Sequence, residues 1–123
     1  MAIAPTISII TVSAFDEVRL SATLKSLVML GEEVEHILVV PRGDLKSVTL
    51  WAEYKSNTGI QMRIMHDANQ GVYQAMNIGG RSAKGDYICF WNAGDELISP
   101  AAMQILISRL KKDRPNWLVF QGD

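Results

Sequence analysis

The chain is 123 residues long, 48% hydrophobic and 20% charged, with a formal net charge of −1. This composition is typical of one globular domain with a sizeable core, and it excludes an intrinsically disordered chain. The near-neutral charge and the lack of a basic stripe argue against a nucleic-acid partner, and the single cysteine, Cys89, excludes a disulfide framework. No apolar run reaches membrane-spanning length and the N-terminus does not resemble a signal peptide, so the expected location is cytoplasmic.

Segments with strand and helix character alternate along the chain. Apolar runs rich in β-branched or aromatic residues predict strands at 7–12, 37–40, 62–65, 87–91 and 117–120. Apolar residues at helical spacing predict helices at 18–31, 45–54, 69–83 and 99–112, with Asn69 and Ser99 as N-caps. This order predicts an α/β fold with a mainly parallel sheet and helices on both faces. We expect a single domain over residues 1–123, truncated because the chain stops just after the last predicted strand.

The helix predicted after Asn69 has two different faces. Tyr73 and Asn77 lie four positions apart, away from most of a stripe of small and apolar residues. That stripe consists of Val72, Ala75, Met76, Gly79 and Ala83. Glycine is costly inside a helix, so a close approach of backbone or ligand would explain Gly71, Gly79 and Gly80.

An acidic turn follows the strand predicted at 87–91. Asn92, Asp95 and Glu96 stand at its carboxyl end, which is the edge where open α/β sheets bind ligands. The two carboxylates can place negative charge ahead of the helix that begins at Ser99, which favours the helix dipole. Alternatively, they can bind Mg²⁺ or Mn²⁺ while substrate phosphates complete the coordination shell. The residues alone allow both interpretations.

Several common catalytic motifs are absent from the sequence. The turn after the first predicted strand lacks G-x-G-x-x-G, and neither a P-loop nor a G-x-S-x-G motif occurs. Nicotinamide-dependent, P-loop and serine-hydrolase chemistries are therefore disfavoured. His36 and His66 flank predicted strands with no nucleophile beside them, so a structural or surface role is favoured over a catalytic one.

Two segments resemble motifs of family 2 glycosyltransferases. Residues 69–79, N-Q-G-V-Y-Q-A-M-N-I-G, are similar to the D-x-G-[IV]-Y-D-A-M-N-x-G segment of that family. Residues 85–95 are similar to its G-D-Y-[IV]-x-F-L-N-[SA]-[DG]-D strand and metal motif. Segments 7–13 and 119–123 resemble the family's first strand and a later strand, so the likeness is collinear over the whole chain. The resemblance implies a GT-A fold, as in enzymes that build bacterial exopolysaccharides such as colanic acid.

The resemblance also implies a site for a nucleotide-diphosphate sugar at the carboxyl edge of the sheet. Asp95 matches the second aspartate of the metal motif, which implies contact with Mg²⁺ or Mn²⁺ and with the diphosphate. The implied substrate-binding residues are Thr11, Ser13 and Phe15 around the nucleobase and ribose, and Asn69, Gly71, Tyr73, Asn77 and Asn92 along the donor cleft.

The sequence departs from the family pattern in places that bear on function. The segment 40–43, V-P-R-G, replaces the usual Asp-Gly-[GS]-Ser after the second strand, whose Asp reads the nucleobase. Asp44 could take over this role only if the turn has a different conformation from the one usual in the family. Asn69 and Gly94 stand where the family usually has aspartates. The family's catalytic base follows a strand like 117–120, so we expect it beyond Asp123 and expect this chain to bind better than it catalyses.

The expected function is sugar transfer, with inversion, from a nucleotide-diphosphate sugar to a glycan or lipid-linked acceptor in bacterial cell-surface polysaccharide biosynthesis. Peripheral membrane association through the absent acceptor half is compatible with this function. An uncovered sheet edge would favour a homo-oligomer. A second hypothesis is a truncated or degenerate, non-catalytic module for nucleotide binding or assembly. A nucleotidyltransferase is a weaker alternative, because the chain lacks the Gly-rich, basic N-terminal loop of that class.

Overall fold

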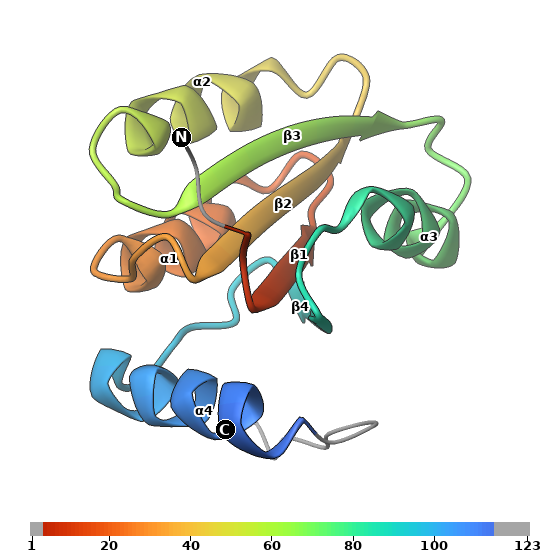
Figure 1. Cartoon of the computed structure of the whole chain (residues 1–123). Helices are drawn as coiled ribbons and strands as arrows, with labels where there is room; N and C mark the ends of the chain where they lie inside the picture. Colours follow the sequence, from red (N-terminus) through yellow and green to blue (C-terminus); the bar gives the residue numbers. More distant parts are fainter. Residues whose placement is uncertain (1–3, 115–123) are drawn as a thin grey trace.

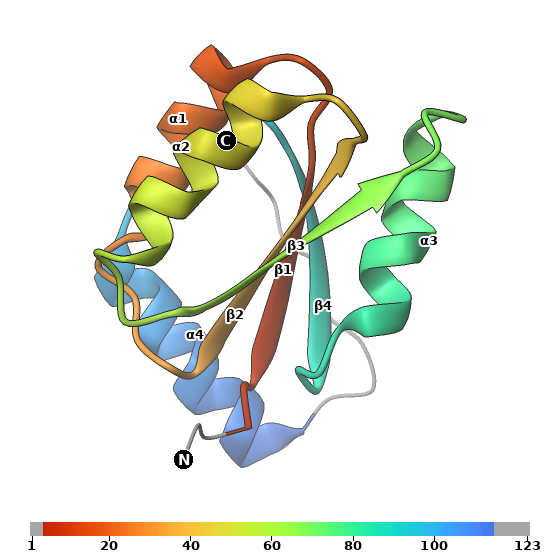
Figure 2. The same cartoon turned by 90° about the horizontal axis from the view of Figure 1, so that it is seen from above.

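The computed structural model describes residues 4–114, which form a four-stranded parallel sheet covered by helices on both faces. The strands are β1 (Ile7–Val12), β2 (Val34–Pro41), β3 (Gln61–Asp67) and β4 (Tyr87–Asn92), in the spatial order β3-β2-β1-β4. The helices are α1 (Glu17–Leu27), α2 (Leu45–Lys55), α3 (Val72–Ser82) and α4 (Pro100–Asp113). Figures 1 and 2 show α1, α2 and α4 on one face of the sheet and α3 on the other. The predicted α/β architecture is confirmed; the strand predicted at 117–120 lies outside the described residues.

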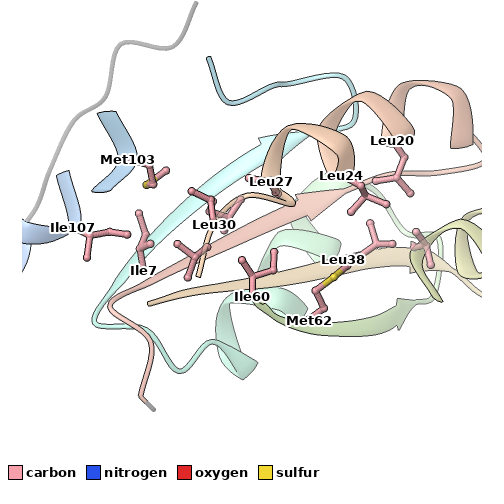
Figure 3. Close-up of a cluster of buried hydrophobic side chains, with 13 residues drawn as sticks. Ile7, Leu20, Leu24, Leu27, Leu30, Leu38, Ile60, Met62, Met103 and Ile107 are labelled. Carbon is pink, nitrogen blue, oxygen red and sulfur yellow. The ribbon is translucent and has the colours of Figure 1, made fainter. Parts of the chain in front are cut away.

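The larger part of the core fills the face covered by α1, α2 and α4. Alternate residues of each strand point to this face, because strand side chains alternate between the two faces of a sheet. The buried side chains labelled in Figure 3 include Leu20, Leu24 and Leu27 of α1, Met103 and Ile107 of α4, and Ile7 and Leu38 of the sheet. The Ser99 hydroxyl accepts a hydrogen bond from the Ala102 N–H at 3.1 Å, which confirms Ser99 as the N-cap of α4.

On the opposite face, α3 packs against the sheet through small residues. Ala75 and Gly79 are buried over Ile10 and Val39. A Cβ atom at position 79 would lie 2.5 Å from Cγ2 of Ile10, so glycine is needed for this close approach. The close approach expected at Gly79 is therefore confirmed.

A buried carboxylate anchors the turn between α3 and β4. Glu35 is 1% exposed, and its Oε1 accepts hydrogen bonds from the Ser8 hydroxyl, the Arg63 guanidinium and the Lys84 N–H, each at 3.0 Å. Arg63 donates a further hydrogen bond to the carbonyl of Ser82. A buried charge is tolerated only when it is paired, so this network ties the end of α3 firmly to the sheet.

Two strands are longer than the sequence predicts. β2 begins at Val34 rather than Ile37, so His36 lies inside the strand instead of before it. β3 continues to Asp67, which pairs in register with Pro41 of β2. Both extensions arise from pairing with a neighbouring strand, and the apolar pattern of a single segment does not contain that information.

Two details of the helices also differ from the predictions. α1 ends at Leu27, before the glycine at position 31 that the sequence indicates as its end. The spacing within 45–54 predicts that Leu45, Val48 and either Ala52 or Trp51 face the core. Val48 and Trp51 pack against the core beside the buried Ser47, whereas the side chain of Leu45 is 72% exposed. Within residues 4–114, no helix is both long and apolar enough to cross a membrane.

β4 forms one edge of the described sheet, although its apolar run predicts burial on both faces. Ile88 and Phe90 are each 46% exposed, on the face that α3 covers elsewhere. The physical reason is that α3 packs over β1, β2 and β3 and leaves this side of β4 only partly covered.

Candidate functional site

A cleft of about 290 Å³ opens at the carboxyl edge of the sheet, between the strand ends and the beginning of α3. Its polar lining consists of Ser13, Asp67, Asn69 and Asn92, and its apolar lining includes Val72 and Ala75. Of the predicted site residues, the structure brings together Ser13, Asn69, Gly71 and Asn92 here. The cleft therefore lies at the edge of the sheet where the sequence predicts a ligand site, and binding of a ligand there stays a prediction.

Ser13 directly follows β1 and presents an unusual hydroxyl. Its backbone N–H donates to the carbonyl of Val39 at 3.1 Å, which holds the residue beside β2. The side chain is buried, and its hydroxyl has no hydrogen-bond partner among residues 4–114. Because an unpaired buried hydroxyl is unfavourable, a ligand that bonds to it gains more than it would at an exposed group.

Thr11 lies outside the cleft, on the opposite face of the sheet. Its buried hydroxyl is 2.8 Å from Nε2 of His36, which is itself fully buried in β2. Burial lowers the pKa of His36 to about 4, because the imidazolium form loses its hydration. These contacts give His36 the structural role that the sequence favours, and they occupy Thr11 in the core.

Phe15 and Asp44 are joined to each other beside the cleft. Phe15 has a φ of 54° and a side chain that is 61% exposed. Asp44 is 3% exposed, and its Oδ2 accepts a hydrogen bond from the Phe15 N–H at 2.8 Å. Its Oδ1 accepts from the Ser47 N–H at 3.4 Å, which caps α2. Both carboxylate oxygens of Asp44 thus accept backbone N–H groups, and the buried side chain has a structural role in this turn. Its role in reading a base stays a prediction.

The loop between β3 and α3 is shaped by backbone conformations with positive φ. Asn69 has a φ of 58°, and Gly71, with a φ of 103°, is the N-cap of α3. The prediction that Asn69 caps this helix is wrong, because the loop places it two residues too early. Instead, the Asn69 N–H donates to Oδ1 of Asp67 at 2.6 Å.

Asp67 is a cleft residue that the sequence reasoning missed. The predicted strand ended at Met65, which left Asp67 in a connecting segment. Continuing the alternation of Arg63 and Met65 by one step would have placed Asp67 on the face covered by α3.

Tyr73 and Asn77 lie on the exposed side of α3, and neither lines the cleft. The side chain of Tyr73 is 79% exposed, next to Val72, which does line it. Their predicted position away from the apolar stripe is confirmed, while their role in binding stays a prediction.

A tight turn at the end of β4 holds Asn92 and Asp95. Oδ2 of Asp95 accepts from the Asn92 N–H at 2.8 Å, and the Asp95 N–H donates to the Asn92 carbonyl at 3.0 Å. Gly94 takes a φ of 102° within the turn, and its N–H donates to the Thr23 hydroxyl at 2.9 Å. Asp95 is exposed, and Asn92 lines the cleft, so one turn connects the predicted metal ligand to the cleft wall.

The described residues offer few protein ligands for a metal ion. Among residues 4–114, no group of three or more His, Cys, Asp or Glu side chains is placed to hold one. Asp95 has one oxygen held by the turn, and its other oxygen makes no hydrogen bond to the described residues. This arrangement fits a Mg²⁺ or Mn²⁺ ion that takes one protein carboxylate and completes its shell with water and phosphate oxygens.

An α/β domain with a cleft at the carboxyl edge of a parallel sheet is a common architecture for binding nucleotides and related ligands. Residues 8–122 match the family model described as glycosyl transferase family 2. The chain therefore belongs to glycosyl transferase family 2, as its motifs indicate. No curated protein matches the sequence.

Solved structures with similar folds support the same architecture. The crystal structure of S. aureus TarS 1–349 superimposes with a TM-score of 0.74 at 15% sequence identity, over 89% of this chain and 33% of that chain. TarS 1–349 in complex with UDP-GlcNAc matches with the same TM-score and identity, over 32% of that chain. The GT-A fold is thus confirmed. This chain spans about a third of the length of these structures.

Proposed function

We propose that this chain is the donor-binding part of a metal-dependent, inverting glycosyltransferase. The substrate is a nucleotide-diphosphate sugar, and the acceptor is a glycan or lipid-linked molecule in bacterial cell-surface polysaccharide biosynthesis. The observation that carries the proposal is the cleft that joins Ser13, Asn69 and Asn92 at the carboxyl edge of a family 2 domain. A TarS structure that contains UDP-GlcNAc shares this fold, which supports a sugar nucleotide as the donor.

The metal in this proposal is Mg²⁺ or Mn²⁺, with Asp95 as its protein ligand. Oδ2 of Asp95 accepts the hydrogen bond that closes the turn, Oδ1 makes no hydrogen bond to residues 4–114, and Asn92 connects the same turn to the cleft. When bound, such an ion would neutralise the charge that develops on the leaving diphosphate. The transfer step also needs a general base within hydrogen-bond reach of the acceptor hydroxyl, and the proposal places that base in sequence beyond Asp123.

Isothermal titration calorimetry with UDP and GDP, with and without Mn²⁺, tests the proposal. We expect binding of one of the nucleotides that strengthens when Mn²⁺ is present. Absence of metal-dependent nucleotide binding, both in this chain and in a longer version of the reading frame, would refute it. Product analysis with the longer version would then identify the acceptor and the stereochemistry.

A second candidate function, a non-catalytic assembly module, is favoured by one observation. Ile88 and Phe90 form a half-exposed apolar pair on the edge strand of the described sheet. Exposed apolar edges promote self-association. Analytical ultracentrifugation of the chain distinguishes the two functions: a clean monomer that binds nucleotide favours the transferase, and a nucleotide-independent oligomer favours the assembly module.

A further inference from the structure

We infer that helix α1 fixes the position of the acidic turn, residues 92–97, and that Thr23 and Ser26 are therefore positioning residues for the metal ion. The inference rests on the proposed function, in which Asp95 of this turn is the protein ligand of Mg²⁺ or Mn²⁺. Neither residue belongs to the two motifs that the sequence shares with the family.

Two hydroxyl groups of α1 accept hydrogen bonds from the backbone of the acidic turn. The Gly94 N–H donates to Oγ1 of Thr23 at 2.9 Å. The Leu97 N–H donates to Oγ of Ser26, also at 2.9 Å. In each bond the two partners are 71 positions apart in the sequence. Because the bonds lie one residue before Asp95 and two residues after it, α1 holds the backbone on both sides of the metal ligand.

The two hydroxyls are themselves firmly placed. Thr23 is 0% exposed, so its side chain cannot turn towards solvent. The Ser26 hydroxyl donates to the carbonyl of Thr23 at 2.8 Å, which orients its oxygen as an acceptor for the Leu97 N–H. Leu24 and Leu27 of the same helix are buried in the core. The turn is thus attached to a rigid part of the molecule.

Arg19 makes a further contact on the same side of α1, four positions before Thr23. A Cβ atom at position 94 would lie 3.6 Å from both Cβ and Cδ of Arg19, so the aliphatic part of this side chain lies over Gly94. This packing covers the turn, while the Thr23 and Ser26 hydroxyls supply the directional bonds.

The middle of the acidic turn has little else to hold it. The bonds between Asn92 and Asp95 close the turn on itself, and Asp95 and Glu96 are exposed. Among residues 4–114, the bond from the Gly94 N–H to Thr23 is the one hydrogen bond that joins residues 94–96 to a segment outside the turn. Groups that orient a metal ligand raise metal affinity without touching the ion. Loss of the Thr23 hydroxyl should therefore weaken binding of the metal.

Titration calorimetry of the chain with UDP and GDP, in Mn²⁺ and in EDTA, tests the inference. Thr23→Val keeps the shape of the side chain and removes the hydroxyl. Loss of this hydrogen bond predicts that the gain in nucleotide affinity caused by Mn²⁺ falls about 3- to 10-fold. The affinity in EDTA should stay unchanged, because the cleft lining itself is not altered.

Thr23→Ser separates a positioning role from a purely structural one. It keeps the hydroxyl but loses a buried methyl group, so it should lower the melting temperature and still retain the full effect of Mn²⁺. Ser26→Ala is an independent variant at a less buried position, and it should reduce the effect of Mn²⁺ several-fold through the Leu97 N–H.

Thr58→Val is the matched control for Thr23→Val. The Thr58 hydroxyl also joins two segments, because it donates to the Val28 carbonyl at 3.2 Å and accepts from the Ile60 N–H at 3.3 Å. It precedes β3, however, and so lies at the amino edge of the parallel sheet, away from the acidic turn. Thr58→Val should lower the melting temperature and leave the effect of Mn²⁺ unchanged.

Amide hydrogen exchange in the metal-free chain gives a readout that needs no ligand. The Gly94 amide should exchange faster in Thr23→Val than in the wild type, because it loses its acceptor. Thr23→Ser should exchange at the wild-type rate, and so should Thr58→Val.

The outcomes separate this inference from the proposed function. If Mn²⁺ strengthens nucleotide binding equally in the wild type and in Thr23→Val, the inference is wrong while the proposed function stands. Equal losses in Thr23→Val and Thr23→Ser, or a loss in Thr58→Val, would also overturn it, because metal binding would then follow stability rather than the hydroxyl. If the wild type shows no metal-dependent nucleotide binding, the proposed function fails, and the inference fails with it.

Discussion

The carboxylate of Asp44 accepts a hydrogen bond from the backbone N–H of Phe15 at 2.8 Å, between segments that are distant in sequence. The same carboxylate caps α2 through the Ser47 N–H. Phe15 meanwhile adopts a left-handed backbone conformation in the turn after β1. One buried side chain thus holds the turn after β1 and the start of α2 in a fixed relation at the edge of the cleft.

Replacing Asp44 by alanine should destabilise the protein by about 2 kcal/mol, because α2 loses its cap and the Phe15 N–H loses its partner. Urea unfolding followed by circular dichroism measures the change. Asp16→Ala is the matched control, since Asp16 also caps a helix, α1, but at a more exposed position. We expect Asp16→Ala to lower the free energy of unfolding by about 1 kcal/mol or less. Equal losses in the two variants would contradict the role assigned to Asp44.

The roles of Asp44 and Asp67 show where prediction from the sequence reaches its limit. Alternating apolar segments and the Ser99 cap are local signals, so the fold class and most elements could be predicted. The acidic turn after β4 pointed to the carboxyl edge of the sheet, where the cleft lies. The hydrogen-bond partners of Asp44 depend instead on how the turn after β1 packs against the start of α2. Asp67 lies in the cleft because β3 pairs with β2 as far as Pro41. Contacts of this kind arise from tertiary pairing, which local patterns do not encode.

Replacing Asp95 by asparagine should remove the metal-dependent part of nucleotide binding. Asparagine keeps an acceptor for the Asn92 N–H, so the turn at the end of β4 should survive. A hard divalent cation prefers a charged carboxylate oxygen, so the enhancement by Mn²⁺ should fall at least tenfold. Glu96→Gln removes a neighbouring exposed charge and serves as the control. Calorimetry with and without EDTA measures both; an enhancement that persists in Asp95→Asn would exclude Asp95 as the ligand.

The adjacent glycines of α3 should respond in opposite directions to alanine. A Cβ atom at position 79 would lie 2.5 Å from Ile10 Cγ2 and 3.1 Å from Val39 Cγ2, so Gly79→Ala must push α3 away from the sheet. We expect a loss of about 1–3 kcal/mol from overpacking. A Cβ atom at position 80 would meet only Phe90, at an ordinary 3.7 Å. Gly80→Ala should therefore stabilise the helix by about 0.5–1 kcal/mol.

Thermal and urea unfolding of the two glycine variants check this prediction. Because the residues are neighbours in one helix, the comparison cancels the common gain in helix propensity. A Gly79→Ala variant as stable as Gly80→Ala would mean that α3 does not approach the sheet as closely as the structure indicates. Nucleotide titration of Gly79→Ala adds a functional readout, because Ala75 on the same face lines the cleft.

Burial of His36 should make the protein less stable in mild acid. The pKa of His36 falls from 6.5 to about 4 on folding, since burial disfavours the imidazolium form. The unfolded chain therefore binds a proton at this residue below pH 6.5, while the native protein does not. The free energy of unfolding therefore decreases as the pH falls from 6.5 towards 4, and this decrease levels off below pH 4. The shift corresponds to about 3 kcal/mol across this interval.

The contribution of His36 is measured as the difference between the urea-unfolding free energies of the wild type and His36→Gln from pH 7 to pH 3.5. Glutamine can keep a hydrogen bond to the Thr11 hydroxyl, now 2.8 Å from Nε2, without taking up a proton. We expect the wild type to lose stability relative to this variant as the pH drops. His66→Gln, at an exposed position on β3, should follow the wild-type profile. Parallel curves for the wild type and His36→Gln would show that the histidine is protonated equally in both states, which its complete burial beside Thr11 argues against.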